Sequence, residues 1–212
     1  MNQTLNAGIV QKALLVCGIL SSLLYIGTDV LAALQWEGYS YTSQAVSELQ
    51  AVGAPTRPLL VSLFSIYNLL IIAFGIGIGL TDNRKQTRFT GILLIGYGIV
   101  GQVALLLFPM HLRGAEVTAS DTMHAVLTGV LVLLIMLYIR FGAALHGKGF
   151  RLYSLATLLV LILFGAWAGL DGPRITAQLP TPWLGIKERI NIYASLLWIL
   201  LLALKTLRPT VR

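Results

Sequence analysis

The segment that joins the third and fourth apolar stretches of this chain contains two histidines and an aspartate that could bind a metal. His111 follows the third stretch, whereas Asp121 and His124 are three residues apart at the start of the fourth. Residues three apart share one face of a helix. Neutral imidazole nitrogens and a carboxylate are ligands that zinc accepts, with one position left for water. We therefore expect His111, Asp121 and His124 to form a candidate zinc site.

An alternative for Asp121 is a structural role. Thr118 and Asp121 have the spacing of a capping box, with aspartate in place of the usual Glu or Gln. Such caps are common at helix starts. We favour this second interpretation for Asp121.

The candidate catalytic residues lie in the sequence TSQAVSELQAVGAPTRP and in the first apolar stretch. Residues 43–52 are expected to form one short helix, which Gly53 ends, with an apolar stripe made of Ala45, Val46, Leu49 and Val52. Glu48 borders the stripe and Ser47 lies opposite it. A charge at such a boundary needs a partner, a metal or a proton. Glu48 is our candidate general base, with Ser47 and Asp29 as further candidates.

Asp29 lies six residues before the end of the first apolar stretch, roughly 9 Å below the membrane surface at 1.5 Å per residue. Acids at such depth are costly and usually face a bundle interior or a wet cavity. Asp29 is therefore a functional candidate. The alternative is that it pairs with Arg57, Arg174 or Arg189.

Four charged residues and one amide are candidates for substrate binding. Asp171 and Arg174 follow the fifth apolar stretch, and Lys187 and Arg189 open the sixth. The two cations of the sixth stretch could hold a phosphate or carboxylate head group. The alternatives are an ion pair of Asp171 with Arg174 or Arg189, and cations that extend to the interface. Asn68, in the second stretch, could also form an interhelical hydrogen bond.

Composition places these residues in a membrane protein. Of 212 residues, 57% are hydrophobic and 11% are charged, and mean hydropathy is +0.82. Soluble domains contain roughly 25% charged residues. An all-α bundle of six transmembrane helices is expected, with a short interfacial helix in the first loop, and residues 1–212 form a single transmembrane domain. The predicted spans are about 13–35, 59–80, 89–109, 122–145, 152–171 and 186–205.

The loop charges predict the orientation. Ten of the fifteen Lys and Arg residues fall in the terminal segments and the second and fourth loops, which places both termini in the cytoplasm. Most acids, together with His111 and His124, then lie at the outer face. The net charge of +7 follows from this topology, and no nucleic-acid partner is expected. Trp36, Tyr39, Tyr41 and Trp183 are typical of an interfacial aromatic belt.

Two glycine patterns favour close helix contacts. Gly75 and Gly79 form a G-x-x-x-G pair in the second span. The third span contains GYGIVG, residues 96–101, which matches a dinucleotide-binding fingerprint but lies inside a membrane helix with no preceding strand. Helix packing is the interpretation that fits this context.

The sequences VSELQAVGAPTRP, LFSIYNLLI, LLLFPMH and DTMHAV resemble those of a family of six-span prokaryotic membrane proteins, domain-of-unknown-function family 998. The resemblance covers about residues 10–205 and implies the topology and the outer cluster but no reaction. The chain also has a more distant similarity to membrane hydrolases of the alkaline ceramidase and adiponectin-receptor kind. It departs from them in having six spans and no paired histidines on a late helix.

Three functions follow as alternatives. The favoured one is metal-assisted hydrolysis of a lipid or amphiphile, with zinc held by His111, His124 and an aspartate, and Glu48 as base. The second is non-enzymatic binding or transport of a lipid, a cation or a small molecule. The third is a scaffold subunit. Membrane lipids are the expected partners, in the cytoplasmic membrane of a bacterium or archaeon.

Overall fold

The computed structural model describes the backbone of residues 2–208 and the side chains of residues 8–208 other than Thr176. Within this range the chain is helical and has no strand. The helices are α1 (Asn2–Gln35), the 3-10 helix η1 (Val46–Gln50), α2 (Arg57–Gly79), α3 (Lys85–Leu107), α4 (Ala119–Gly142), α5 (Lys148–Gly169), α6 (Gly172–Thr176) and α7 (Leu184–Leu207).

Six helices of the described chain are long and apolar enough to cross a membrane, which confirms the predicted all-α class and the number of spans. Several helices begin before the predicted spans. α1 starts at Asn2 and α3 at Lys85. The first turns of these helices are polar, so hydropathy alone does not mark where the helices begin.

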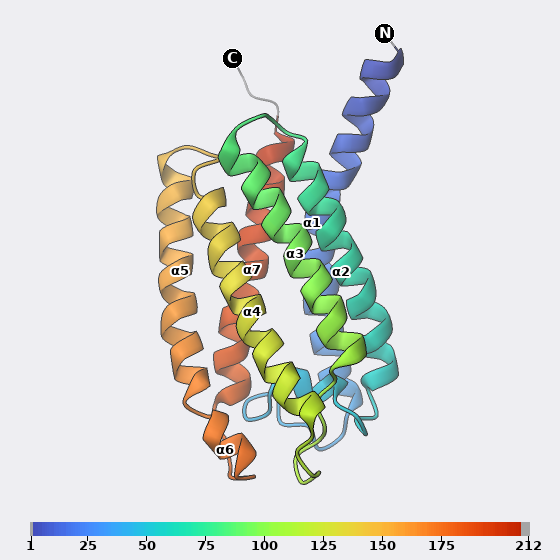
Figure 1. Ribbon diagram of the computed structural model, residues 1–212, viewed down its shortest axis with the longest axis vertical. Helices are drawn as coiled ribbons and strands as arrows, with labels where there is room; N and C mark the ends of the chain where they lie inside the picture. The colour runs from blue at the N-terminus through green and yellow to red at the C-terminus, as the bar shows by residue number, and fades with distance from the viewer. Residues whose placement is uncertain (1, 209–212) are drawn as a thin grey trace.

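The spans form antiparallel hairpins, and the start of α1 and the end of α7 lie at one end of the bundle (Figure 1). We call this the terminal end. The opposite end, which we call the lid end, contains α6, the loop between α3 and α4, and residues 36–56, which we call the lid segment. Around the bundle α4 packs on α3, α3 on α2, α2 on α1, α1 on α7, and α7 on α5.

The predicted glycine contacts are present between α2 and α3. A Cβ atom on Gly91 would lie 2.6 Å from the carbonyl oxygen of Gly75 and 3.0 Å from the nitrogen of Gly79. A Cβ on Gly98, within the GYGIVG sequence, would lie 2.8 Å from the Asn68 carbonyl oxygen. These glycines therefore let two backbones approach closely, and the dinucleotide-like sequence has a packing role.

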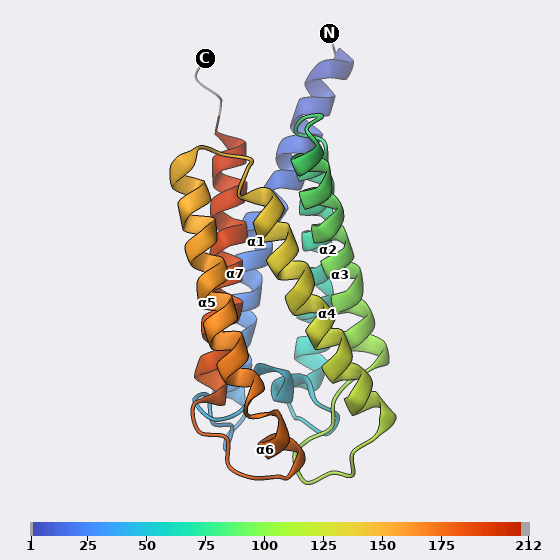
Figure 2. The same cartoon turned by 60° about the vertical axis from the view of Figure 1, so that its left-hand side comes forward.

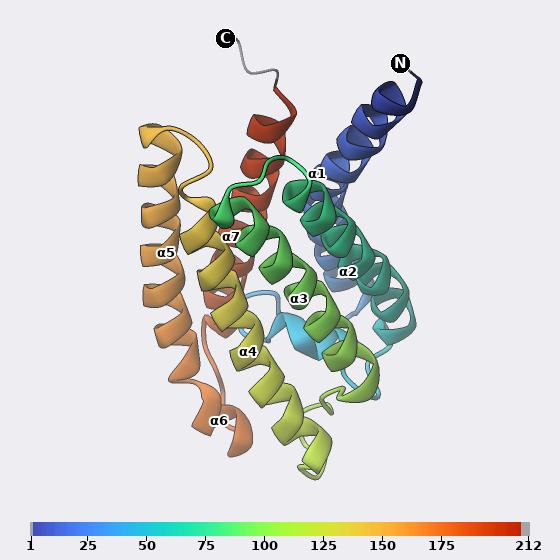
Figure 3. The same ribbon diagram turned by 45° about the horizontal axis from the view of Figure 1, so that its top comes forward.

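The ring of helices is least tightly closed between α4 and α5. The two helices are close at the terminal end and diverge toward the lid end (Figures 2 and 3), and in Figure 2 η1 is visible between them. No residue of α4 from 119 to 137 is buried, and none of α5 from 162 to 169. By contrast, Tyr138 at the other end of α4 is fully buried against Trp198 of α7. We call the side between the diverging halves the open side.

The lid segment differs from the predicted helix over 43–52. Its helical part is only the five-residue η1, which is flanked by Ala45 and Ala51 in extended conformation, and the Val52 N–H donates to Met110 O at 2.8 Å. Val46 and Leu49 of the predicted stripe are buried, whereas Val52 is 38% exposed. Gly53 has a φ of +93°, which fits its predicted role in ending the segment.

Candidate functional site

A buried ion pair joins α1 to α7 beneath the lid segment. The carboxylate of Asp29, with 0% exposure, accepts from Arg189 Nε at 2.9 Å and from Arg189 Nη2 at 2.8 Å. Tyr193 Oη donates to the same carboxylate at 2.5 Å. The pairing alternative for Asp29 is thereby confirmed, with Arg189 as the partner. This bidentate geometry is the strong form of the Arg–carboxylate interaction.

The remaining donors of Arg189 hold the lid segment and the first turn of α7. Nη1 donates to Tyr41 O at 2.7 Å and to Gly185 O at 3.3 Å, and Nη2 donates to Tyr39 Oη at 3.0 Å. The guanidinium also lies 3.5 Å from the centre of the Tyr41 ring. All five N–H groups of this arginine therefore have acceptors.

Tyr39 links the guanidinium to the start of η1. Its hydroxyl accepts from Arg189 and donates to Ala45 O at 2.9 Å. Burial raises the pKa of Tyr39 to about 12, and the hydrogen bond from Arg189 opposes this rise. The phenol therefore stays protonated at neutral pH and keeps its hydrogen for the lid segment.

The lid backbone approaches α7 at a position where only glycine fits. A Cβ atom on Gly185 would collide with the carbonyl oxygens of Tyr41 and Gln44. Two further backbone contacts fix the same stretch. Ile186 N–H donates to Thr42 O at 3.3 Å, and Thr181 Oγ1 donates to Ser43 O at 2.8 Å. The lid segment is therefore packed on the bundle as part of the fold.

Glu48 forms the second ion pair of the lid end. Its carboxylate accepts from Arg113 Nε at 3.0 Å and Arg113 Nη2 at 2.8 Å, from Gln44 Nε2 at 3.0 Å and from Ala45 N–H at 2.8 Å. Glu48 is 1% exposed, whereas the Arg113 side chain is 22% exposed. Four donors occupy the carboxylate, so Glu48 is held as a clamp between η1 and the loop joining α3 to α4.

Glu188 lies between these two ion pairs. It is half-buried, and its Oε2 accepts from Val46 N–H of η1 at 2.8 Å. Arg189, Glu48 and Arg113 are within electrostatic range of it. Among the residues that the structure describes, no cationic side chain forms an ion pair with it. Glu48 and Asp29 each have an arginine partner, so Glu188 is the acid of this cluster without an ion-pair partner among the described residues.

The fifth span is joined to α7 by a third buried ion pair. Lys187 Nζ donates to Asp171 Oδ2 at 2.7 Å, and lies 4.6 Å from the centre of the Trp167 ring. The predicted partners of Asp171, Arg174 and Arg189, are engaged elsewhere, since Arg174 Nε donates to Pro180 O at 2.8 Å. This corrects the predicted pairing. Lys187 and Arg189 lie inside the protein and are not exposed to an external head group.

The predicted zinc ligands meet only in part. His111 Nδ1 lies 3.0 Å from Asp121 Oδ2, and Asp121 also accepts from the His111 and Thr118 N–H groups. Thr118 and Asp121 form the capping box of α4, which confirms the structural interpretation. His124 Nδ1 donates to Phe108 O at 2.9 Å, since a carbonyl can only accept. Within residues 2–208 no three His, Cys, Asp or Glu side chains are grouped to hold a metal.

The last two candidates are Asn68 in α2 and Ser47 in η1. Asn68 Nδ2 donates to Gln102 Oε1 at 3.1 Å, and Gln102 Nε2 donates to Ser65 Oγ at 2.9 Å. This confirms the predicted interhelical hydrogen bond between α2 and α3. Ser47 is half-buried on η1, next to Glu48.

Sequence patterns did not reveal several residues that build the lid end. Arg113 is 65 positions from Glu48, and no spacing rule connects them. Tyr39 and Tyr41 were expected in an interfacial belt, yet they contact Arg189. Tyr193 follows Arg189 by four residues, which places both on one helix face, so this spacing was an available signal.

These observations define a multi-pass helical membrane protein whose lid end is joined by buried ion pairs. The chain belongs to the family described as "Protein of unknown function (DUF998)", whose model matches residues 19–205. No curated protein and no solved structure matches the chain. The family resemblance is confirmed, and the similarity to ceramidase-type hydrolases stays a prediction.

Replacing Asp29 by alanine should strongly destabilise the protein, because Arg189 would remain buried without its counter-charge. Removing one partner of a buried pair costs about 3–5 kcal/mol. We expect a clear drop in the thermal unfolding temperature of the purified protein in detergent. Glu37→Ala is the matched control, since Glu37 is an exposed acid just beyond the end of the same helix. Equal unfolding temperatures for the two variants would contradict the assigned role of the pair.

Proposed function

We propose that this protein binds a membrane amphiphile non-enzymatically, with the polar head at Glu188 and the apolar chain in the open side between α4 and α5. The observation that carries the proposal is the position of Glu188. Its carboxylate is half-buried beneath the lid segment, without an ion-pair partner among the described residues. Ionisable groups at such a position mark binding or transport sites by default.

The environment of Glu188 favours a head group with a positive charge or several hydrogen-bond donors. Desolvation of a carboxylate is unfavourable unless a donor or a cation compensates for it. Val46 N–H supplies one donor. The arginines within electrostatic range of Glu188, Arg113 and Arg189, are already bound to Glu48 and Asp29. An ammonium group brought by a ligand would complete the cluster.

The open side gives such a ligand an apolar route from the bilayer. The diverging halves of α4 and α5 expose large apolar side chains, namely Met123, Val126, Val130, Val132, Leu133, Ile162, Leu163 and Trp167. The lid segment, fixed to α7 and to the loop between α3 and α4, covers the end of the bundle. A ligand with a chain therefore enters more readily from the side than through the lid end.

The same geometry favours binding over metal-assisted hydrolysis. A general base needs a free carboxylate within reach of the reacting proton. The carboxylates of Glu48 and Asp29 are occupied by arginines and further donors. The histidines His111 and His124 turn their Nδ1 atoms toward Asp121 and Phe108 O. These groups therefore act more readily as structural clamps than as a reaction centre.

Glu188→Gln should weaken amphiphile binding while preserving the fold, because glutamine can still accept from Val46 N–H. In lipid nanodiscs, a photoreactive long-chain amine should label the facing halves of α4 and α5. We expect labelling of Glu188→Gln to fall about tenfold, as for loss of one charged hydrogen bond. The measurement is mass spectrometry of the labelled peptides, with unfolding temperature as the fold check.

Glu116→Gln is the control, because Glu116 is an exposed acid in the loop between α3 and α4. It should label as the wild type does. An alkyl sulfate probe of equal chain length should label weakly, since Glu188 repels it. Equal labelling with the amine and the sulfate probes, or equal labelling of the wild type and Glu188→Gln, would contradict the proposal.

We further propose that the terminal end faces the cytoplasm of a prokaryotic cell and that the lid end faces outward. The support is the excess of Lys and Arg at the terminal end. A fluorescent protein that folds only in the cytoplasm should be bright when fused to the C-terminus. Alkaline phosphatase, which is active only outside the cytoplasm, should be active when inserted after Gly114 and inactive at the C-terminus. The reverse pattern would overturn the orientation.

A further inference from the structure

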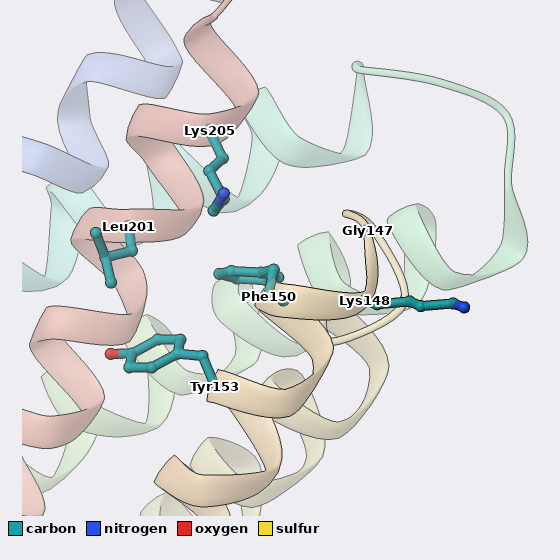
Figure 4. A pocket seen from close by; sticks show the side chains of 7 residues that line it. Gly147, Lys148, Phe150, Tyr153, Leu201 and Lys205 are labelled. Carbon is teal, nitrogen blue, oxygen red and sulfur yellow. The ribbon is translucent and has the colours of Figure 1, made fainter.

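A cavity of about 390 Å³ lies at the terminal end, between the first turns of α5 and the last turns of α7. Its walls include Phe150 and Tyr153 of α5 and Leu201 and Lys205 of α7 (Figure 4). In this view the Lys205 side chain extends over the Phe150 ring, whereas Lys148 points away from the cavity. The cavity is remote from the lid end, so none of its lining residues belongs to the site described above.

Lys205 of this cavity has no acidic partner among the residues that the structure describes. Lys205 is exposed and lies 6.0 Å from the centre of the Phe150 ring, and no described carboxylate pairs with it. The acid that the described residues place at this end is Asp82, which is bound to Arg84 at 2.7 Å. Burial, together with the charges of Lys205 and Arg84, lowers the pKa of His146 nearby. The cavity therefore carries uncompensated positive charge.

Phe150, Tyr153 and Leu201 form a mainly apolar wall that continues along the bundle surface. Phe150 is buried, Tyr153 and Leu201 are half-buried, and Leu197, one turn before Leu201 in α7, is 47% exposed. A cation above an apolar wall matches a molecule with an anionic head and an acyl chain. Basic groups at the ends of membrane helices attract anionic lipids in this way.

We propose that this cavity binds the phosphate head group of an anionic phospholipid, with Lys205 contacting the phosphate and Leu201 contacting the acyl chain. The occupant is a lipid rather than a soluble phosphate, because the apolar wall lies directly beside the cation. Lys205 is a binding residue in this assignment. The site is independent of amphiphile binding at Glu188, since it lies at the other end of the bundle.

Native mass spectrometry of the full-length protein in nanodiscs tests the assignment, with phosphatidylglycerol and phosphatidylcholine of the same chains as probes. The wild type should retain phosphatidylglycerol in preference to phosphatidylcholine. Lys205→Ala should reduce this retention about fivefold, the change expected for one basic group near the surface. Lys205→Arg keeps the charge and should restore it.

Lys12→Ala is the matched control, because Lys12 is an exposed lysine on α1 at the same end and does not line the cavity. It should retain phosphatidylglycerol as the wild type does. Equal losses in Lys205→Ala and Lys12→Ala would overturn the site. Inorganic phosphate that displaces the lipid at millimolar concentration from wild-type protein would overturn its assignment to a phospholipid.

Discussion

The lid end depends on the buried ion pair between Asp29 and Arg189. Two charges removed from water are stable only when the geometry is good and the remaining donors are satisfied. Here two N–H groups of Arg189 bind the carboxylate, and the other three bind Tyr41 O, Gly185 O and Tyr39 Oη. Displacing the lid segment would remove acceptors from a charge that stays buried. The pair between α1 and α7 therefore also fixes the lid segment.

The Glu48–Arg113 pair extends this constraint to the other half of the bundle. It ties η1 to the loop between α3 and α4, and the His111–Asp121 contact joins that loop to the first turn of α4. The lid segment is thus held from both sides, whereas α4 and α5 have few buried contacts in their facing halves. This contrast is the reason that the amphiphile we propose at Glu188 is expected to enter from the open side.

The sequence predicted the features that composition and local spacing determine. Six spans follow from hydropathy and the cap of α4 from Thr118 and Asp121, and a buried partner for Asp29 was one of the two alternatives that its depth left open. Ion pairs between residues far apart in the sequence were harder to predict. Nothing in the sequence near Glu48 identifies Arg113, and Asp171 pairs with Lys187 rather than with the arginine three residues away.

The divergence of α4 and α5 also could not be predicted from the sequence. In a membrane, side chains that face lipid and side chains that face a neighbouring helix have similar hydrophobicity, so apolar periodicity does not show which faces pack. The close contact between α2 and α3 could be predicted from the sequence, because glycine has no side chain to keep two helix backbones apart. The separated helices have no equivalent signal.

Hydrogen exchange of the lid segment in nanodiscs tests most directly whether the buried ion pairs fix it. The amides of Ala45, Val46 and Val52 donate to Glu48, Glu188 and Met110 O, so they should exchange slowly, whereas the exposed loop 114–117 should exchange fast. Arg113→Ala should accelerate exchange at Ala45. Lid amides that exchange as fast as loop 114–117 in the wild type would contradict the account.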